Sequence, residues 1–316
     1  MSRFSEIKVL AFQLLPKPFQ TKILSYVEDK RIKYWQECFK TKVSQQQVYE
    51  LFSKMAIDCD VMIHSSLPDI GNIKLKHVTD ALKDSVLDKG HTVLCPALPV
   101  KGSTLEYLKT ITEFDVRSAP NAMGSISCYF GRQTDAVRSM SPTHSVVAEG
   151  PKASYYVSEH HLSETPFTEK SPYYKLIENK GKILMFGASL NHLTFNHVLE
   201  DMIGEELFPV KVYDSARFEI ELINESGEKS RGIFRTHSHK NGRLRDSKEA
   251  MKLVRSLPST KVYSLGCGEV LLLDARDVIV CLLSSLKKGI TTMGRRHTSA
   301  KCQQKADLMI RAIQQL

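Results

Sequence analysis

The stretch VMIHSSL, at positions 61–67, decides the fold that we expect for this chain. It begins with an apolar run, as a buried strand does, and it ends in the polar residues His64, Ser65 and Ser66. In open α/β sheets, ligands bind in the crevice outside the carboxyl ends of the strands. We therefore expect these three polar side chains to lie at the edge of a binding site.

The segments on either side of this stretch predict a strand–helix–strand unit. Upstream, Ser44 is a candidate N-cap for a helix that ends near Met55 and carries its apolar residues on one stripe. Downstream, residues 78–87 have the pattern of a helix and residues 92–94 that of a second strand. Two strands joined through a helix are expected to pair in parallel, with a right-handed crossover.

The remaining elements extend this unit to a larger α/β fold. Residues 182–186 form another apolar run that predicts a buried strand, and Thr194 is a candidate N-cap for the helix that follows. Residues 218–222 alternate with the period of a strand. Further helices are predicted at 123–130, 247–256, 277–286 and the C-terminus. We expect a mixed central sheet flanked by helices, with a smaller β-rich C-terminal part.

A second polar stretch, VRSMSPTHSVVAEGP, occupies positions 137–151. It places a cation, hydroxyl groups and an imidazole within eight positions, in Arg138, Ser139, Thr143, His144 and Ser145. The stretch is more polar than core segments usually are. We therefore predict a surface loop, because loops held by a rigid scaffold often carry functional residues.

Length and composition are those of a globular protein with a large core. The 316 residues are 42% hydrophobic and 25% charged, and no apolar run reaches the ~18 residues that a membrane span needs. We expect no cleavable leader. Seven cysteines without C-x-x-C spacing predict reduced thiols in a cytoplasmic protein. The net charge of +9 favours an acidic partner, such as a phosphate-bearing cofactor; without a recognisable motif we expect no nucleic acid.

Residues 1–43 differ from the rest, and we predict a basic amphipathic extension ahead of a main domain at 44–316. Apolar residues recur at helical spacing on both sides of Pro16 and Pro18, which interrupt the pattern, and basic residues cover the other faces. One interpretation is a pair of short helices that pack on the main domain. The other is peripheral contact with an anionic membrane surface or a partner.

In the order of its motifs, the chain resembles the aminoglycoside 3-N-acetyltransferase family of antibiotic N-acetyltransferases. The resemblance covers roughly residues 44–285. Its motifs are VMIHSSL with Gly71, Met123-Gly124, the 137–150 stretch, His160-His161, Pro166-Phe167, Ser171-Pro172-Tyr173 with Leu176, Gly187, Thr194 with His197 and Glu200, and Gly266 with 274–277. It implies transfer of an acetyl group from acetyl-CoA to a primary amine of a sugar-like acceptor.

The resemblance implies a direct transfer assisted by a general base. Histidine suits this role because its pKa lies near the working pH. We assign His197 as the base, with Glu200 or another carboxylate to orient it. His197 and Glu200 are three positions apart and share a helix face, which is also the spacing of an ordinary surface pair. Thr143 and His144 are candidates for stabilising the thioester oxyanion, together with Ser145 and backbone amides.

The co-substrate acetyl-CoA needs a cradle for its pantetheine and phosphates. We assign this role to His64, Ser65 and Ser66 at the strand end, and to the polar stretch at 138–145 through Arg138, Ser139 and Ser145. A serine hydrolase with Ser66 as nucleophile lacks the Gly-x-Ser-x-Gly elbow. The adjacent residues His160 and His161 lack metal-ligand spacing, so we expect no metal.

Two departures from the family bear on the acceptor. Ser141-Pro142 stands where the family usually has His-Pro, and Cys128 stands where an acidic residue is common. A basic protein also suits polycationic aminoglycosides poorly. We therefore favour an amino sugar linked to a nucleotide or lipid, as in surface-polysaccharide synthesis. An aminoglycoside acceptor, with antibiotic resistance, is the alternative, and a non-catalytic acyl-CoA-binding protein is a further one. A homodimer is also considered.

Overall fold

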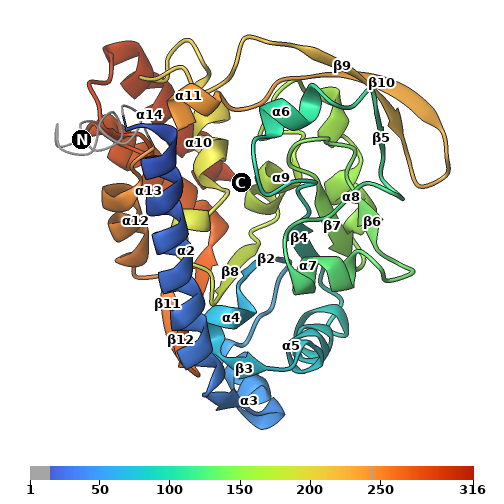
Figure 1. The fold of residues 1–316 in the computed structure, drawn as a ribbon. Coiled ribbons are helices and arrows are strands. Elements are labelled where there is room, and N and C mark those ends of the chain that lie inside the picture. Colours follow the sequence, from blue (N-terminus) through green and yellow to red (C-terminus); the bar gives the residue numbers. More distant parts are fainter. Residues whose placement is uncertain (1–14, 243–244) are drawn as a thin grey trace.

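A computed structural model describes residues 15–242 and 245–316, and its fold is drawn in Figure 1. The apolar pattern ahead of Pro16 lies outside these residues. A seven-stranded mixed sheet forms the centre of the protein, in the order β11-β12-β8-β2-β4-β7-β6. The strands are β11 (Lys261–Leu265), β12 (Gly268–Asp274), β8 (Lys182–Phe186), β2 (Val61–Ser65), β4 (Val93–Pro96), β7 (Val146–Glu149) and β6 (Val137–Arg138).

The predicted strand β2 lies in the middle of this sheet. It pairs in parallel with β4 on one side and with β8 on the other, with His64 opposite Met185 and Ser65 opposite Phe186. The remaining pairs in the sheet are antiparallel. The predicted α/β fold with a mixed central sheet is therefore confirmed, and the carboxyl ends of β2 and β8 lie side by side.

Alternate side chains along the central strands enter two separate cores. Met62 and Met185 belong to the larger core, on the face covered by α9 (Pro172–Glu178), α10 (Asn196–Ile203) and α13 (Ala275–Lys287). Val61 and Ile63 belong to the other, on the face of α3 (Gln45–Met55), α5 (Leu75–Leu82) and α7 (Ser125–Phe130). This alternation follows from the two-residue period of a strand that is buried on both faces.

The helices begin and end where local signals predict, with small shifts. Ser44 caps α3 in a capping box with Gln47, which accounts for the start of the helix. The helix expected at 78–87 is α5 followed by a π-helical turn at Lys83–Leu87. The other helices and turns are α4 (Leu67–Ile70), α6 (Thr104–Leu108), α8 (Ala153–Val157), α11 (His239–Gly242), α12 (Lys248–Arg255), α14 (Ala300–Gln315) and the 3-10 turns His160–Leu162 and Leu190–His192.

The small β-rich part is a separate three-stranded sheet. The hairpin of β9 (Phe218–Ile223) and β10 (Lys229–Phe234) pairs through β9 with β5 (Glu113–Asp115). β5 comes from the middle of the chain, so this sheet is not formed from the C-terminal part alone. The strands β11 and β12 join the central sheet instead. Two short pairs complete the described strands: β1 (Lys42–Val43) with β3 (Asn72–Ile73), and β13 (Ile290–Thr291) with β14 (Gly294–Arg295).

The polar stretch at 137–151 is not a surface loop, and that prediction is wrong. It forms the edge hairpin of β6 and β7, and its six polar residues from Arg138 to Ser145 are each at most 8% exposed. Their polar groups bond to one another and to backbone atoms of distant segments. Burial of polar groups is tolerated when such partners exist, and the sequence alone did not reveal these partners.

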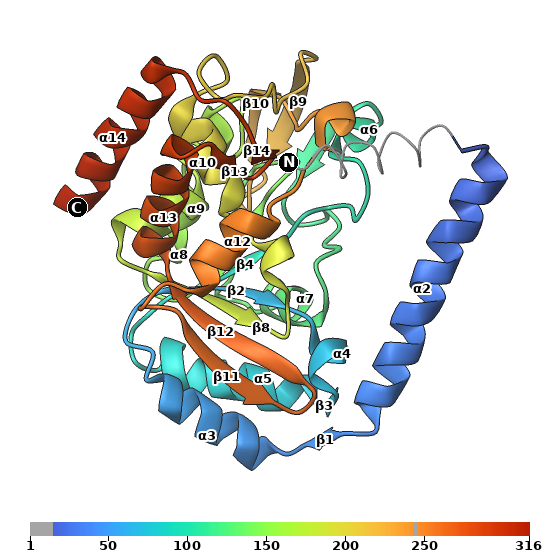
Figure 2. The ribbon, with the colours of Figure 1, turned by 90° about the vertical axis from the view of Figure 1, so that its left-hand side faces the viewer.

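In the described part of the N-terminal extension, α2 (Lys17–Phe39) is one long helix with Pro18 in its first turn. Proline is tolerated in the first turn because its missing N–H would be unpaired there. Figure 2 shows α2 standing along one side of the molecule and meeting the rest at its lower end, near α4. No helix in the described residues is long and apolar enough to cross a membrane. Membrane contact through this extension stays a prediction.

Candidate active site

The catalytic pair that the sequence predicts lies on the first turn and a half of α10. This helix follows β8 through Gly187 and a 3-10 turn, and it begins at Asn196 instead of at Thr194. The carbonyl of Thr194 accepts a hydrogen bond from the amide of His197. The three-residue spacing places the side chains of His197 and Glu200 on one face, with Nδ1 of the imidazole 2.9 Å from Oε2 of the carboxylate.

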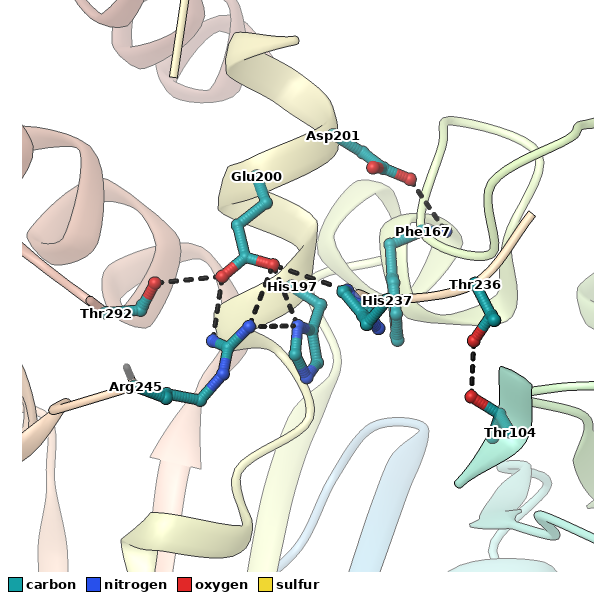
Figure 3. Close-up of polar contacts among 9 residues, drawn as sticks. All are labelled: Thr104, Phe167, His197, Glu200, Asp201, Thr236, His237, Arg245 and Thr292. Atoms are coloured by element: carbon teal, nitrogen blue, oxygen red, sulfur yellow. Dashed lines mark hydrogen bonds and ion pairs between the residues drawn. The ribbon is translucent and has the colours of Figure 1, made fainter. Parts of the chain in front are cut away.

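Glu200 is fully buried and is held by groups from two other segments (Figure 3). Nη1 of Arg245 lies 2.8 Å from Oε1, and the hydroxyl of Thr292 donates to the same oxygen at 2.9 Å. Burial raises the pKa of Glu200, but the opposing charge of Arg245 and the contact with His197 bring the pKa well below its ordinary value. The carboxylate is therefore ionised, and its Oε2 accepts a hydrogen bond from the protonated Nδ1 of His197.

This pairing orients the His197 ring. With Nδ1 donating to Glu200, the neutral tautomer leaves Nε2 with a free lone pair, and Figure 3 shows this nitrogen pointing away from Glu200 and Arg245. The side chain of His197 is 19% exposed to solvent. Burial, followed by the nearby His237 and Arg245, lowers the pKa of His197 to about 3, against the opposing effect of Glu200. At neutral pH the ring is an unprotonated base.

Aromatic side chains enclose the base. The ring of Phe167 stacks against His197 with centroids 5.0 Å apart, and the ring of His237 lies 4.1 Å from it on another side. His144 is 6.2 Å away, centroid to centroid. It is buried, its Nδ1 has no hydrogen-bond partner among the described residues, and burial brings its pKa well below the ordinary value. The structure thus brings His144 to the predicted site, and Thr143 is buried beside it.

Sequence reasoning missed three members of this cluster. Arg245 and Thr292 bind Glu200 from 45 and 92 positions away, and Nε2 of His237 lies 3.4 Å from its Oε2 without hydrogen-bond geometry. No local sequence pattern singles out His237. No spacing rule connects residues so far apart, so only the fold could identify them.

A cavity of about 1320 Å³ lies at the carboxyl ends of β2 and β8, and His197 and Glu200 are not among its lining residues. Its floor is formed by the predicted residues His64, Ser65 and Ser66 at the end of β2, and by residues 187–192 after β8. Thr194, three positions before His197, also lines it. On another side it reaches Met123 and Gly124 at the start of α7. The prediction that polar residues at the carboxyl end of β2 line a crevice is confirmed.

Arg138, Ser139 and Ser145, which we expected to hold the cofactor, do not line this cavity. The guanidinium of Arg138 donates to the carbonyls of Ala97, Ala119 and Pro120 at 2.6–2.8 Å and to the hydroxyl of Ser145. The hydroxyl of Ser139 bonds to Nδ1 of His160 and to the amide of Val146. All three side chains are used to hold loops to the sheet edge, which is a structural role.

The described residues contain one cluster with metal-ligand chemistry, formed by His197, Glu200 and His237, whose ligand atoms lie within 4.8 Å of one another. Arg245 already neutralises the carboxylate of Glu200 at 2.8 Å. A divalent cation there would be repelled by this guanidinium. We therefore assign the cluster to an ion-paired base and not to a metal.

Comparisons with known proteins identify the family of the chain. The family model described as aminoglycoside 3-N-acetyltransferase matches residues 62–287, which is more than half of the chain. Aminoglycoside N(3)-acetyltransferase III from Salmonella sp is 25% identical over 287 residues, covering 82% of this chain and 97% of that protein. The protein of the same name from Enterobacter cloacae matches equally well.

Solved structures share the fold. The aminoglycoside acetyltransferase AAC(3)-Xa superposes with a TM-score of 0.64 at 20% identity, covering 80% of this chain and 95% of that one. AAC-IIIb, solved as a binary complex with CoASH, superposes with a TM-score of 0.61 at 20% identity. The match covers 78% of this chain and 96% of that one. The YokD protein from Bacillus subtilis superposes with a TM-score of 0.62 at 20% identity. The match covers 77% of this chain and 93% of that one. The chain therefore belongs to the aminoglycoside 3-N-acetyltransferase family.

Proposed function

We propose that this protein is an acetyl-CoA-dependent N-acetyltransferase that acetylates a primary amine of an aminoglycoside. The observation that carries the proposal is the neutral His197, oriented through Nδ1 by a buried, ionised Glu200, three positions after Thr194, which lines the cavity. Family membership supports the reaction class.

The proposed acceptor is an aminoglycoside, which the sequence offered as the alternative to a nucleotide- or lipid-linked amino sugar. The curated relatives reported above are named as aminoglycoside acetyltransferases, and a related structure, AAC-VIa, was solved bound to sisomicin. These names support an aminoglycoside over a nucleotide- or lipid-linked sugar of polysaccharide synthesis. The basic charge of the chain, which led us to the latter, is a property of the whole surface and says little about one pocket.

In the proposed reaction, the acceptor amine attacks the thioester carbonyl of acetyl-CoA. Nε2 of His197 takes the proton that the nitrogen loses as the C–N bond forms. The C–S bond then breaks, and the thiolate of CoA leaves and takes up a proton. Glu200 stabilises the imidazolium that forms, and Arg245 and Thr292 hold Glu200 in place.

The predicted supporting residues are placed as follows in this proposal. His64, Ser65 and Ser66 hold the thioester end of the co-substrate at the floor of the cavity. The ring of His144 lies 6.2 Å from that of His197, centroid to centroid, and Thr143 precedes it in the chain; we propose that both stabilise the oxyanion. The cytoplasmic location and a homodimer stay predictions.

The first test is the variant His197→Ala, assayed by release of the CoA thiol with a panel of aminoglycosides. We expect kcat to fall by about 10²–10⁴-fold, the usual contribution of a general base, while the melting temperature stays close to that of the parent. His297→Ala is the matched control, because this histidine is exposed. Full turnover by His197→Ala would remove the base from the mechanism.

The acceptor is tested in the same assay with nucleotide-linked amino sugars. Turnover of aminoglycosides alone supports the proposed substrate class, whereas turnover of the nucleotide-linked sugars alone overturns it. Binding of CoA by calorimetry without turnover of any amine would indicate the non-catalytic alternative.

A further inference from the structure

The helix α2 forms one wall of the cavity, although it lies outside the residues that match the family model. Arg31, Tyr34 and Trp35 of α2 line the space, whereas the matched segment begins at residue 62. The opposite wall includes α12, which is more than 200 positions away in sequence. Figure 2 shows α2 running along one side of the molecule, with α4 beside its lower end.

The lower half of α2 is fastened to the floor of the cavity. Nε1 of Trp35 donates to Oδ1 of Asp69 at 2.9 Å, and the hydroxyl of Ser66 donates to the other oxygen of the same carboxylate. The thiol of Cys267 bonds to the hydroxyl of Thr41 at 3.0 Å. Asp69 therefore links the helix to a serine that we assign to the co-substrate site.

The backbone also approaches closely at this point. A Cβ on Gly71 would lie 2.7 Å from the carbonyl oxygen of Thr41, and the φ of +128° already favours glycine. The turn after α2 is thus packed directly on the chain that follows β2. This contact holds the C-terminal end of α2 against the chain that follows β2.

Cations from both walls face the cavity. Arg31 on α2 and Lys248 and Lys252 on α12 line it, and none of them has an ion-pair partner in the described part of the chain. Arg31 lies over the ring of Trp35 at 4.4 Å. The acidic residues in the wall are already engaged: Asp69 by Trp35 and Ser66, and Glu269 by Arg255 at 2.8 Å. Unpaired cations that converge from separate elements suit a ligand with several negative charges.

We propose that α2 is part of the acetyl-CoA site, and that Arg31, together with Lys248 and Lys252, binds the phosphates of the nucleotide end. This inference rests on the proposed function. The thioester has to lie near His197, at the side of the cavity where Thr194 is found. The rest of the long co-substrate then extends toward α2. Arginine binds phosphate through paired N–H groups, which gives this end of the ligand a defined position.

The kinetic test compares Arg31→Gln with Lys33→Gln, an exposed lysine of the same helix that does not line the cavity. Loss of a hydrogen-bonded charge should raise the KM for acetyl-CoA about tenfold, with kcat nearly unchanged. The KM for S-acetylpantetheine, which lacks the phosphates, should be unchanged. Equal KM values for acetyl-CoA in the two variants would overturn the proposal, as would equal increases for both donors.

A second test needs no turnover, because Trp35 is the only tryptophan of the chain. Addition of CoA to the full-length parent protein should change its fluorescence in a saturable way, and Arg31→Gln should shift the midpoint to about tenfold higher CoA. If calorimetry detects CoA binding but the fluorescence and the midpoint do not change, α2 is not part of the site. If calorimetry detects no CoA binding at all, the proposed function fails with it.

Discussion

At the scale of single residues, one buried carboxylate organises the candidate site. Glu200 is fully buried and touches a base, a guanidinium and a hydroxyl. The pairing of His197 with Glu200 could be predicted because it depends only on helical spacing. The ion pair with Arg245 could not, since it depends on how a distant loop returns to α10. Without this cation, burial would favour the protonated acid, which lacks the negative charge that stabilises a protonated His197.

Arg138 provides a test of the structural role that replaces its predicted one. In Arg138→Met, the carbonyls of Ala97, Ala119 and Pro120 lose their buried donor. We expect the free energy of unfolding to fall by about 3 kcal/mol or more, because each unsatisfied buried group is costly. The measurement is urea denaturation, together with the KM for acetyl-CoA in the folded fraction, which should not change.

The control for this experiment is Arg132→Met, at an exposed position. This change should alter the unfolding free energy by no more than about 0.5 kcal/mol, as surface substitutions usually do. A variant Arg138→Met that keeps its stability but binds acetyl-CoA poorly would restore the predicted role in the cofactor site.

At the scale of elements, the candidate site lies at the carboxyl ends of two neighbouring parallel strands, β2 and β8. β2 supplies the polar floor of the cavity, and β8 leads through Gly187 into the helix that carries the base. Both strands were predicted from apolar runs and both are confirmed. The placement of α2 over the same cavity was not predicted, because helical periodicity says nothing about which side of a domain a helix will meet.

Gly187 is the turn on which this arrangement depends. Its φ is +72°, and a Cβ there would lie 2.4 Å from the carbonyl oxygen of Ser66. Gly187→Ala should therefore destabilise the protein by more than the ~1 kcal/mol of left-handed backbone strain alone, and should raise the KM for acetyl-CoA by moving Ser66. Thermal unfolding and steady-state kinetics measure the two effects.

Gly90 is the control position, because it distinguishes the cost of backbone strain from the cost of a steric clash. Its φ is +81°, but an added Cβ would meet no atom within 4 Å. Gly90→Ala should show only the strain cost, with unchanged kinetics. Equal losses of stability in the two variants would mean that the close approach of Ser66 to Gly187 is unimportant.

At the scale of the whole molecule, burial of titratable groups makes the fold sensitive to acid. Burial lowers the pKa values of His64 and His160 to about 4. The unfolded chain therefore binds protons between pH 6.5 and 4 where these folded groups do not, and stability falls as the pH falls through this window. Asp201 opposes this, because burial raises its pKa to about 7 and the folded state takes up a proton first.

Between pH 6.5 and 5, we expect each of the two histidines to lower the free energy of unfolding by about 2 kcal/mol. Protonation of Asp201 should offset roughly the contribution of one histidine. Urea midpoints measured at pH 6.5 and pH 5 should therefore differ, with the lower midpoint at pH 5. The variant His160→Asn, which cannot titrate, should show a smaller difference. Identical midpoints at the two pH values in the parent would contradict this picture of the core.

The sequence by itself determined the central strands, the N-cap Ser44, the three-residue spacing of His197 and Glu200, and the family. These depend on local periodicity, on single capping residues, and on motifs that keep their order along the chain. Only the tertiary structure decided that the polar segment after Val137 is buried, that Arg245 and Thr292 hold Glu200, and that α2 walls the cavity. The physical reason is that a buried polar group is stabilised by partners from remote segments, and no local pattern records where those partners come from.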